Sequence, residues 1–220
     1  MTSEEKLKRI AKILEDEFGI PKRERKDPLE TLIKTILSQN TNDKNRDTAY
    51  EGLKKRFPTW KEAADASPFE IARVIRPGGL HNQKGERIKN LLLWVRKNYP
   101  SFDISPLCKL SFEELEERLG RLPGIGAKTL AILMLFSCGK EVFPVDTHIN
   151  RIMKRLGIVP ERATAERTFR LLKGKIPEGK SYSLHLNLIN LGRTICRAKK
   201  SLCSHCPISS FCLYYQRKGR

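Results

Sequence analysis

The chain has 220 residues and is strongly basic, with 43 Lys and Arg against 25 Asp and Glu and a formal charge of +18. A surplus of this size favours nucleic acid or an anionic membrane surface as the partner. No apolar run approaches the about 20 residues that a membrane-spanning helix needs, and the N-terminal segment lacks the apolar core of a signal peptide. We therefore expect an intracellular protein with no membrane association.

Apolar residues recur at helical spacing along almost the whole chain, and no segment shows the sustained alternation of a strand. Ser111 forms a Ser-x-x-Glu capping box with Glu114, and Ser67 precedes Pro68 at the start of another helix. The sequence therefore predicts an all-α fold. The predicted helices cover residues 5–18, 28–39, 44–56, 84–98, 112–120, 127–138, 147–157, 163–174 and 181–195, with one more beginning at Ser67.

A glycine-containing turn joins the predicted helices 112–120 and 127–138. Gly124 and Gly126 flank one apolar residue, which lets the backbone approach a ligand closely. The amide groups that enter the second helix lack helical partners and lie at the positive end of its dipole, so they form a candidate phosphate site. An ordinary helical hairpin is the alternative. The candidate ligand-binding residues of this turn are Leu122, Gly124, Gly126 and Thr129.

Four of the six cysteines lie in the last 25 residues with the spacing C-x6-C-x2-C-x5-C. Thiolates packed this closely in sequence usually bind a metal. The candidate ligands are Cys196, Cys203, Cys206 and Cys212. The same segment carries Arg197, Lys199 and Lys200, which makes it a candidate phosphate-binding loop.

The other two cysteines, Cys108 and Cys138, lie apart from this run and among apolar residues. Free cysteines are commonly buried in protein cores. We expect both to be buried and chemically inert.

Three motifs in this order resemble the endonuclease III-like DNA glycosylases/AP lyases of the helix-hairpin-helix (HhH-GPD) superfamily. FEELEERLGRLPGIGAKTLAILMLFS resembles the hairpin, FPVDTHINRIMKRLGIV the loop with its aspartate, and the cysteine run the [4Fe-4S] loop. The resemblance extends from about residue 28 to 212. It implies two helical lobes with a DNA-binding cleft between them: a helical domain of 25–134, and an iron–sulfur domain of 1–24 plus 135–220. A monomer that acts on double-stranded DNA is expected.

Zinc is the alternative metal for the four cysteines. Structural zinc sites with four cysteines usually contain two short C-x2–4-C pairs, and here Cys203 and Cys206 form the only one. The spacing is closer to that of the glycosylase cluster, so we expect a [4Fe-4S] cluster with a structural role.

The resemblance assigns the chemistry to Lys128 and Asp146. Lys128 lies in the first turn of a helix, where the dipole disfavours a cation, and a neutral lysine amine forms Schiff bases. In the family the matching lysine attacks C1′ of the damaged nucleotide, and the Schiff base then permits β-elimination. Asp146 is expected to cap the next helix, to assist deprotonation of the lysine and to stabilise positive charge at the sugar.

Two further turns resemble the loops with which the family probes the DNA strand. In LSQNTND, Asn40 aligns with a wedge glutamine and Gln39 precedes it, so which of the two amides enters the base stack is open. In GGLHNQK, Leu80 matches an intercalating leucine and His81 replaces a tyrosine. A core role for Leu80 and a surface role for His81 are the alternatives.

The substrate is less sharply defined than the chemistry. Relatives that remove adenine carry a glutamate near Thr35, and this chain has no acid there. Lys128 favours a bifunctional enzyme of base excision repair that also cleaves the abasic strand, and an oxidised pyrimidine is the simplest choice of substrate within the family. A mismatch glycosylase for uracil or thymine, a non-catalytic duplex-binding module and a zinc-dependent regulator remain alternatives.

Overall fold

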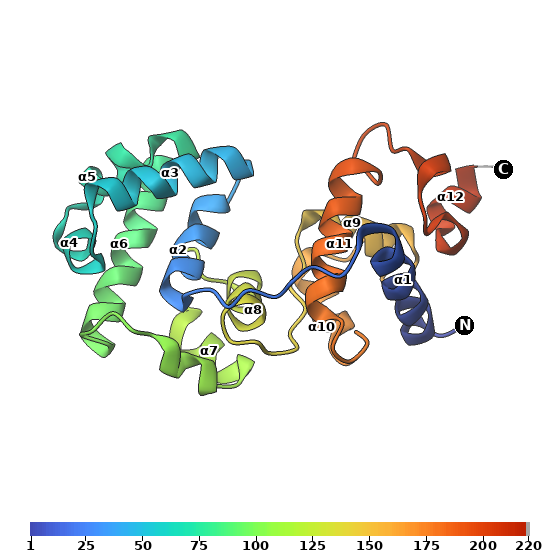
Figure 1. The fold of residues 1–220 in the computed structure, drawn as a ribbon, viewed down its shortest axis with the longest axis horizontal. Coiled ribbons are helices and arrows are strands. Elements are labelled where there is room, and N and C mark those ends of the chain that lie inside the picture. The colour runs from blue at the N-terminus through green and yellow to red at the C-terminus, as the bar shows by residue number, and fades with distance from the viewer. Residues whose placement is uncertain (219–220) are drawn as a thin grey trace. The chain divides into compact units, whose positions relative to one another are not determined.

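The computed structural model describes residues 1–218, and all regular structure in that range is helical (Figure 1). The prediction of an all-α fold is confirmed. The chain divides into two compact units: residues 25–138, and residues 1–24 together with 139–220. No helix among the described residues is long and apolar enough to cross a membrane.

The unit of residues 25–138 is built around two helices, α2 and α6. Helix α6 packs against α2, α4 and α5, while α2 also packs against α3 and α8. Their inward faces bury Leu32, Ile36, Leu91 and Leu92 completely. The helices of this unit are α2 (Pro28–Ser38), α3 (Asp43–Arg56), α4 (Trp60–Asp65), α5 (Pro68–Val74), η1 (Arg76–Gly78), α6 (His81–Asn98), η2 (Ser105–Lys109), α7 (Phe112–Leu119) and α8 (Ala127–Phe136).

The predicted capping residues begin their helices as expected. Ser111 and Glu114 exchange both hydrogen bonds of a capping box at the start of α7. Ser67 does the same with Glu70 at the start of α5, where Pro68 is the first helical residue. These bonds satisfy backbone donors that a helix start otherwise leaves open, so the local sequence fixes where both helices begin.

In the second unit, α11 packs against α1 and α9, and α9 also contacts α10 and α12. Leu7, Ile10, Leu14, Ile149 and Leu188 are among the apolar residues that form its core. The helices of this unit are α1 (Ser3–Phe18), α9 (Thr147–Arg155), α10 (Ala165–Leu172), α11 (Ser181–Thr194), η3 (Cys203–His205), η4 (Ser209–Phe211) and α12 (Leu213–Lys218).

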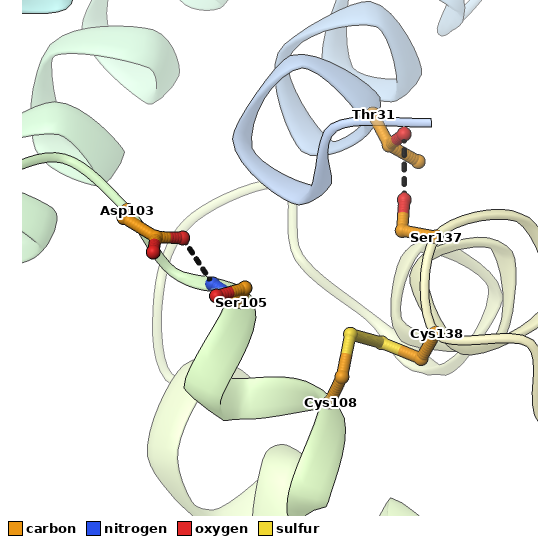
Figure 2. The surroundings of a disulfide bond; sticks show 6 residues. All are labelled: Thr31, Asp103, Ser105, Cys108, Ser137 and Cys138. Carbon is orange, nitrogen blue, oxygen red and sulfur yellow. Dashed lines mark hydrogen bonds between the residues drawn. A yellow bond between two sulfur atoms is a disulfide. The ribbon is translucent and has the colours of Figure 1, made fainter. Parts of the chain in front are cut away.

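The expectation that Cys108 and Cys138 are buried and inert is wrong, because the two form a disulfide bond (Figure 2). Both residues are only half-buried. Cys138 follows Ser137, the C-cap of α8, and precedes Gly139, which has a φ of 72°, so it lies in a turn and not on the apolar face of the helix. Figure 2 shows that η2, which carries Cys108, approaches this turn.

A hydrogen bond next to the disulfide holds the same end of α8 against α2. The buried hydroxyl of Ser137 donates to Thr31 Oγ1 at 2.8 Å (Figure 2). The C-terminal end of α8 is therefore attached to η2 by a covalent bond and to α2 by a hydrogen bond.

Candidate functional site

The turn between α7 and α8 requires glycine at position 124 for two reasons. Gly124 has a φ of 86°, a region that favours glycine. A Cβ atom there would also lie 2.6 Å from Cδ of Arg87, so any other residue would displace the Arg87 side chain. Gly126 is the N-cap of α8 and, within residues 1–218, no side chain caps this helix start. The first amides of α8 therefore receive no hydrogen bond from a capping side chain.

Lys128 and Thr129 follow in the first turn of α8, with different surroundings. The Lys128 side chain is exposed. Thr129 is only 4% exposed, and its hydroxyl donates to the Gly124 carbonyl at 3.3 Å. The Thr129 side chain therefore ties the helix to the turn.

Asn40 and Leu80 lie at the tips of the two turns that resemble strand-probing loops. Both have left-handed backbone conformations, with φ values of 52° and 45°. Such a conformation is uncommon for residues other than glycine and often marks a functional loop. Asn40 is exposed, and Leu80 is 50% exposed although it is a large apolar residue. His81, the first residue of α6, is half-buried.

Gln39 differs from Asn40 because its side chain is engaged within the protein. Its Nε2 donates to the Gly124 carbonyl at 2.9 Å, and its Oε1 accepts a hydrogen bond from Arg87 at 2.6 Å. Of the two amides left open by the sequence, Asn40 is the one that faces solvent. Arg87 was not predicted, and nothing in the local pattern indicates its role.

Asp146 caps α9, as predicted. Its Oδ1 accepts a hydrogen bond from the backbone N–H of Ile149 at 2.8 Å, and the side chain is half-buried. The preceding Pro144 and Val145 are buried, which anchors the loop that leads to the cap. The carboxylate is thus held by its own helix and belongs to the unit of residues 1–24 and 139–220.

The four clustered cysteines line a single pocket together with Arg155, Ile195, Ser209, Tyr214 and Tyr215. Arg155 Nη1 donates to Cys196 Sγ at 3.1 Å and to the Arg197 carbonyl at 2.8 Å. The Arg155 guanidinium also lies over the Tyr214 ring, 4.5 Å from its centroid. Sequence reasoning missed Arg155, which places a positive charge beside the thiols.

The chemistry of this pocket suits a bound cation. Burial raises the pKa of the Cys206 thiol to about 11. A hydrogen bond from the Ile208 backbone lowers this pKa, and the charges of the other three cysteines raise it. Burial also raises the pKa of Cys212. Thiolates are therefore costly here unless a metal compensates their charge. Within residues 1–218 no group of three or more His, Cys, Asp or Glu side chains is arranged to hold a metal ion.

The predicted basic loop lies next to this pocket. Arg197, Lys199 and Lys200 are all exposed, and Lys200 has a φ of 53°. Backbone bonds close the loop at its base, where the Leu202 N–H donates to the Ile195 carbonyl at 3.0 Å. The loop therefore presents three cations to solvent beside the four thiols.

These features define an all-helical protein with a glycine-turn hairpin, an exposed lysine at the second helix and a four-cysteine pocket. Residues 33–178 match the HhH-GPD superfamily of base excision DNA repair proteins, and the chain belongs to this family. The resemblance seen in the sequence is confirmed, and so is the class of enzyme that it implies.

Relatives and solved structures agree with this family. The chain is 34% identical to endonuclease III of Thermotoga maritima, over 88% of this chain and 86% of that protein. It is 27% identical to a thymine-DNA glycosylase of Aeropyrum pernix, over 89% and 86% of the two chains. A trapped covalent intermediate of endonuclease III with DNA has the same fold, with a TM-score of 0.84, 24% identity and full coverage of both chains.

Proposed function

We propose that the protein is a bifunctional DNA glycosylase and AP lyase that uses Lys128 as its nucleophile. The observation that carries the proposal is the position of Lys128, exposed in the first turn of α8 directly after the glycine turn. The open amides of this helix start bind a DNA phosphate, which brings the sugar of the neighbouring nucleotide to the amine. The family and its endonuclease III relatives support this assignment.

The reaction uses the neutral amine of Lys128. Its lone pair forms a bond to C1′ as the bond from C1′ to the base breaks, and the base leaves with the bonding electrons and takes up a proton. One proton of the amine then moves to O4′ as the bond from C1′ to O4′ breaks, which opens the sugar ring and gives a protonated Schiff base between Nζ and C1′. Removal of a proton from C2′ then expels the 3′ phosphate by β-elimination, and hydrolysis releases Lys128.

Asp146 supports this chemistry through its charge. We propose that its carboxylate accepts a proton from Lys128 and stabilises the positive charge that develops at the sugar. The same carboxylate caps α9, so a test must separate the two roles.

Asp146→Asn separates the roles because asparagine caps a helix as well as aspartate does. The free energy of unfolding is expected to change by less than about 0.5 kcal/mol. Base release is expected to fall by about a hundredfold, the size of effect seen when one charge-stabilising group is removed from an active site. Urea denaturation and single-turnover kinetics measure the two quantities. A stable variant with the wild-type rate would remove Asp146 from the mechanism.

We further propose that Cys196, Cys203, Cys206 and Cys212 hold a [4Fe-4S] cluster. The four thiols line one pocket, and their spacing in the sequence is closer to that of the glycosylase cluster than to the paired spacing of a four-cysteine zinc site. A bound cluster would compensate the negative charge of the four thiolates and hold the loop between them rigid. The pocket then holds Arg197, Lys199 and Lys200 toward a DNA phosphate.

Cys203→Ser tests the ligand assignment. The variant is expected to lose the visible absorbance of the purified protein and most of its bound iron and sulfide. The double variant Cys108→Ser/Cys138→Ser, which alters cysteines outside the pocket, should keep both. Stoichiometric zinc without sulfide in the wild-type protein would refute the cluster.

Oxidised pyrimidines are the substrates that we propose first. Thr35, at the position where adenine-removing relatives carry a glutamate, donates its hydroxyl to the Thr31 carbonyl of its own helix and supplies no acid. The thymine-DNA glycosylase among the relatives favours thymine or uracil opposite guanine as the second candidate.

Borohydride trapping tests the proposed function directly. The duplexes should carry thymine glycol, uracil or thymine opposite guanine, or an abasic site. A covalent adduct is expected, and the base that is trapped best identifies the lesion. Base release without an adduct would indicate a monofunctional glycosylase, and binding without release or adduct would favour a non-catalytic duplex-binding module.

A further inference from the structure

Lys84 is a fully buried lysine in the unit of residues 25–138, with no exposed surface. Its Nζ donates hydrogen bonds to the carbonyls of Leu37 and Gly78, both at 2.7 Å. Burying an amine is costly unless its hydrogen bonds are made. Packing alone does not require an amine at this position, because an apolar side chain could fill the same space. The two hydrogen bonds of Lys84 therefore indicate what the residue does.

The two carbonyls belong to the ends of separate helices, immediately before the two proposed probing loops. Leu37 is in the last turn of α2, two residues before Gln39. Gly78 ends η1, two residues before Leu80. A cation stabilises the carbonyls that a helix leaves open at its C-terminal end. One side chain of α6 therefore holds the starting points of both loops.

Arg87 provides a second connection from the same helix. It lies three residues after Lys84, on the same face of α6, and its guanidinium holds Gln39, whose amide in turn donates to Gly124. The loop that carries Asn40 is thus linked to the hairpin turn through Gln39, which Arg87 holds in place, and to the loop that carries Leu80 through Lys84.

We propose that Lys84 is a positioning residue that fixes the Asn40 and Leu80 loops relative to each other, so that both side chains enter the DNA duplex together. The inference rests on the proposed function, because it assigns these loops to the DNA. Extruding a paired base requires that the gap in the stack be filled. Two loops that moved independently would fill that gap less often, whereas a nucleotide that has already lost its base needs less assistance.

Lys84→Met tests this role because methionine has a similar shape and cannot donate. A matched control exists five residues further along α6. Lys89 also donates to two backbone carbonyls, those of Ala64 and Ala66 at the end of α4, and neither carbonyl belongs to a probing loop. Lys89→Met therefore removes the same kind of bond from the same helix.

Hydrogen exchange of the free proteins measures the coupling independently of catalysis. Lys84→Met is expected to speed amide exchange in residues 38–43 and 78–83 together, and Lys89→Met should leave both loops at the wild-type rate. If Lys84→Met does not fold, Lys84→Gln, with a shorter neutral donor, replaces it. Unchanged exchange in both loops would overturn the proposal.

Kinetics then connect the coupling to DNA. In Lys84→Met the single-turnover rate of base release is expected to fall at least about tenfold more than the cleavage rate of a preformed abasic site. A purely structural role predicts equal losses in both rates, as for Lys89→Met, and equal losses would overturn the proposal. If the wild-type protein released no base while exchange rose in both loops, the proposed function would fail but the coupling through Lys84 would stand.

Discussion

Lys128→Ala is expected to lower strand cleavage at an abasic site by at least about a thousandfold, or about 4 kcal/mol in activation free energy. The side chain is exposed and packs against no core, so its loss removes a nucleophile without disturbing α8. Gel assays of cleavage and borohydride trapping measure the effect. The affinity for duplex DNA should fall by no more than the loss of one phosphate contact would cause.

Lys128→Arg is the matched control for charge. Arginine keeps the cation that binds phosphate, but its guanidinium stays protonated and does not form a Schiff base. The variant should bind DNA like the wild-type protein and form no adduct. An arginine variant that still cleaves at the wild-type rate would make Lys128 a phosphate contact only.

Removal of the disulfide with Cys108→Ser/Cys138→Ser is expected to lower the free energy of unfolding by about 3 kcal/mol, because the bond closes a long loop in the unfolded chain. The two cysteines are separated by 30 positions. Both tryptophans of the chain, Trp60 and Trp94, lie in the unit of residues 25–138. Tryptophan fluorescence during urea denaturation therefore reports the unit that carries the bond.

A reductant supplies the control for this experiment. It should lower the stability of the wild-type protein to that of the double variant and leave the variant itself unchanged. If the wild-type protein in reductant unfolded at its original urea concentration, the bond would contribute nothing to stability.

Local patterns predict most of the helices because each carries its own apolar spacing and caps. The helix predicted for 84–98 begins three residues earlier, at His81, since Leu80 adopts a left-handed conformation before it and the polar first turn shows no apolar spacing. Helix α4 (Trp60–Asp65) was missed because six residues are too few to establish a period. Two of its residues, Ala63 and Ala64, are completely buried by tertiary packing.

In the candidate site, too, the features that lie within one short segment could be predicted, and the contacts between distant segments could not. The glycine turn, the capping role of Asp146 and the run of four cysteines are contiguous motifs, and the sequence reveals them. The Cys108–Cys138 bond and the contacts of Arg87 and Arg155 join residues that are far apart in the chain, so no local pattern contains them. Lys84 did leave a signal, because it shares the apolar face of α6 with Ile88.

The partners of Lys84 are backbone carbonyls, and this affects how the protein can evolve. Every amino acid carries a carbonyl, so substitutions at Asn40, Leu80 or His81 leave the bonds to Leu37 and Gly78 in place. The residues that we propose to contact DNA can therefore change from one lineage to another, or be randomised in a library, while the spacing between the loops is retained. Lys84 fixes the positions of the two loops whatever side chains they carry. A search for enzymes with new lesion preferences should therefore vary Asn40, Leu80 and His81 first.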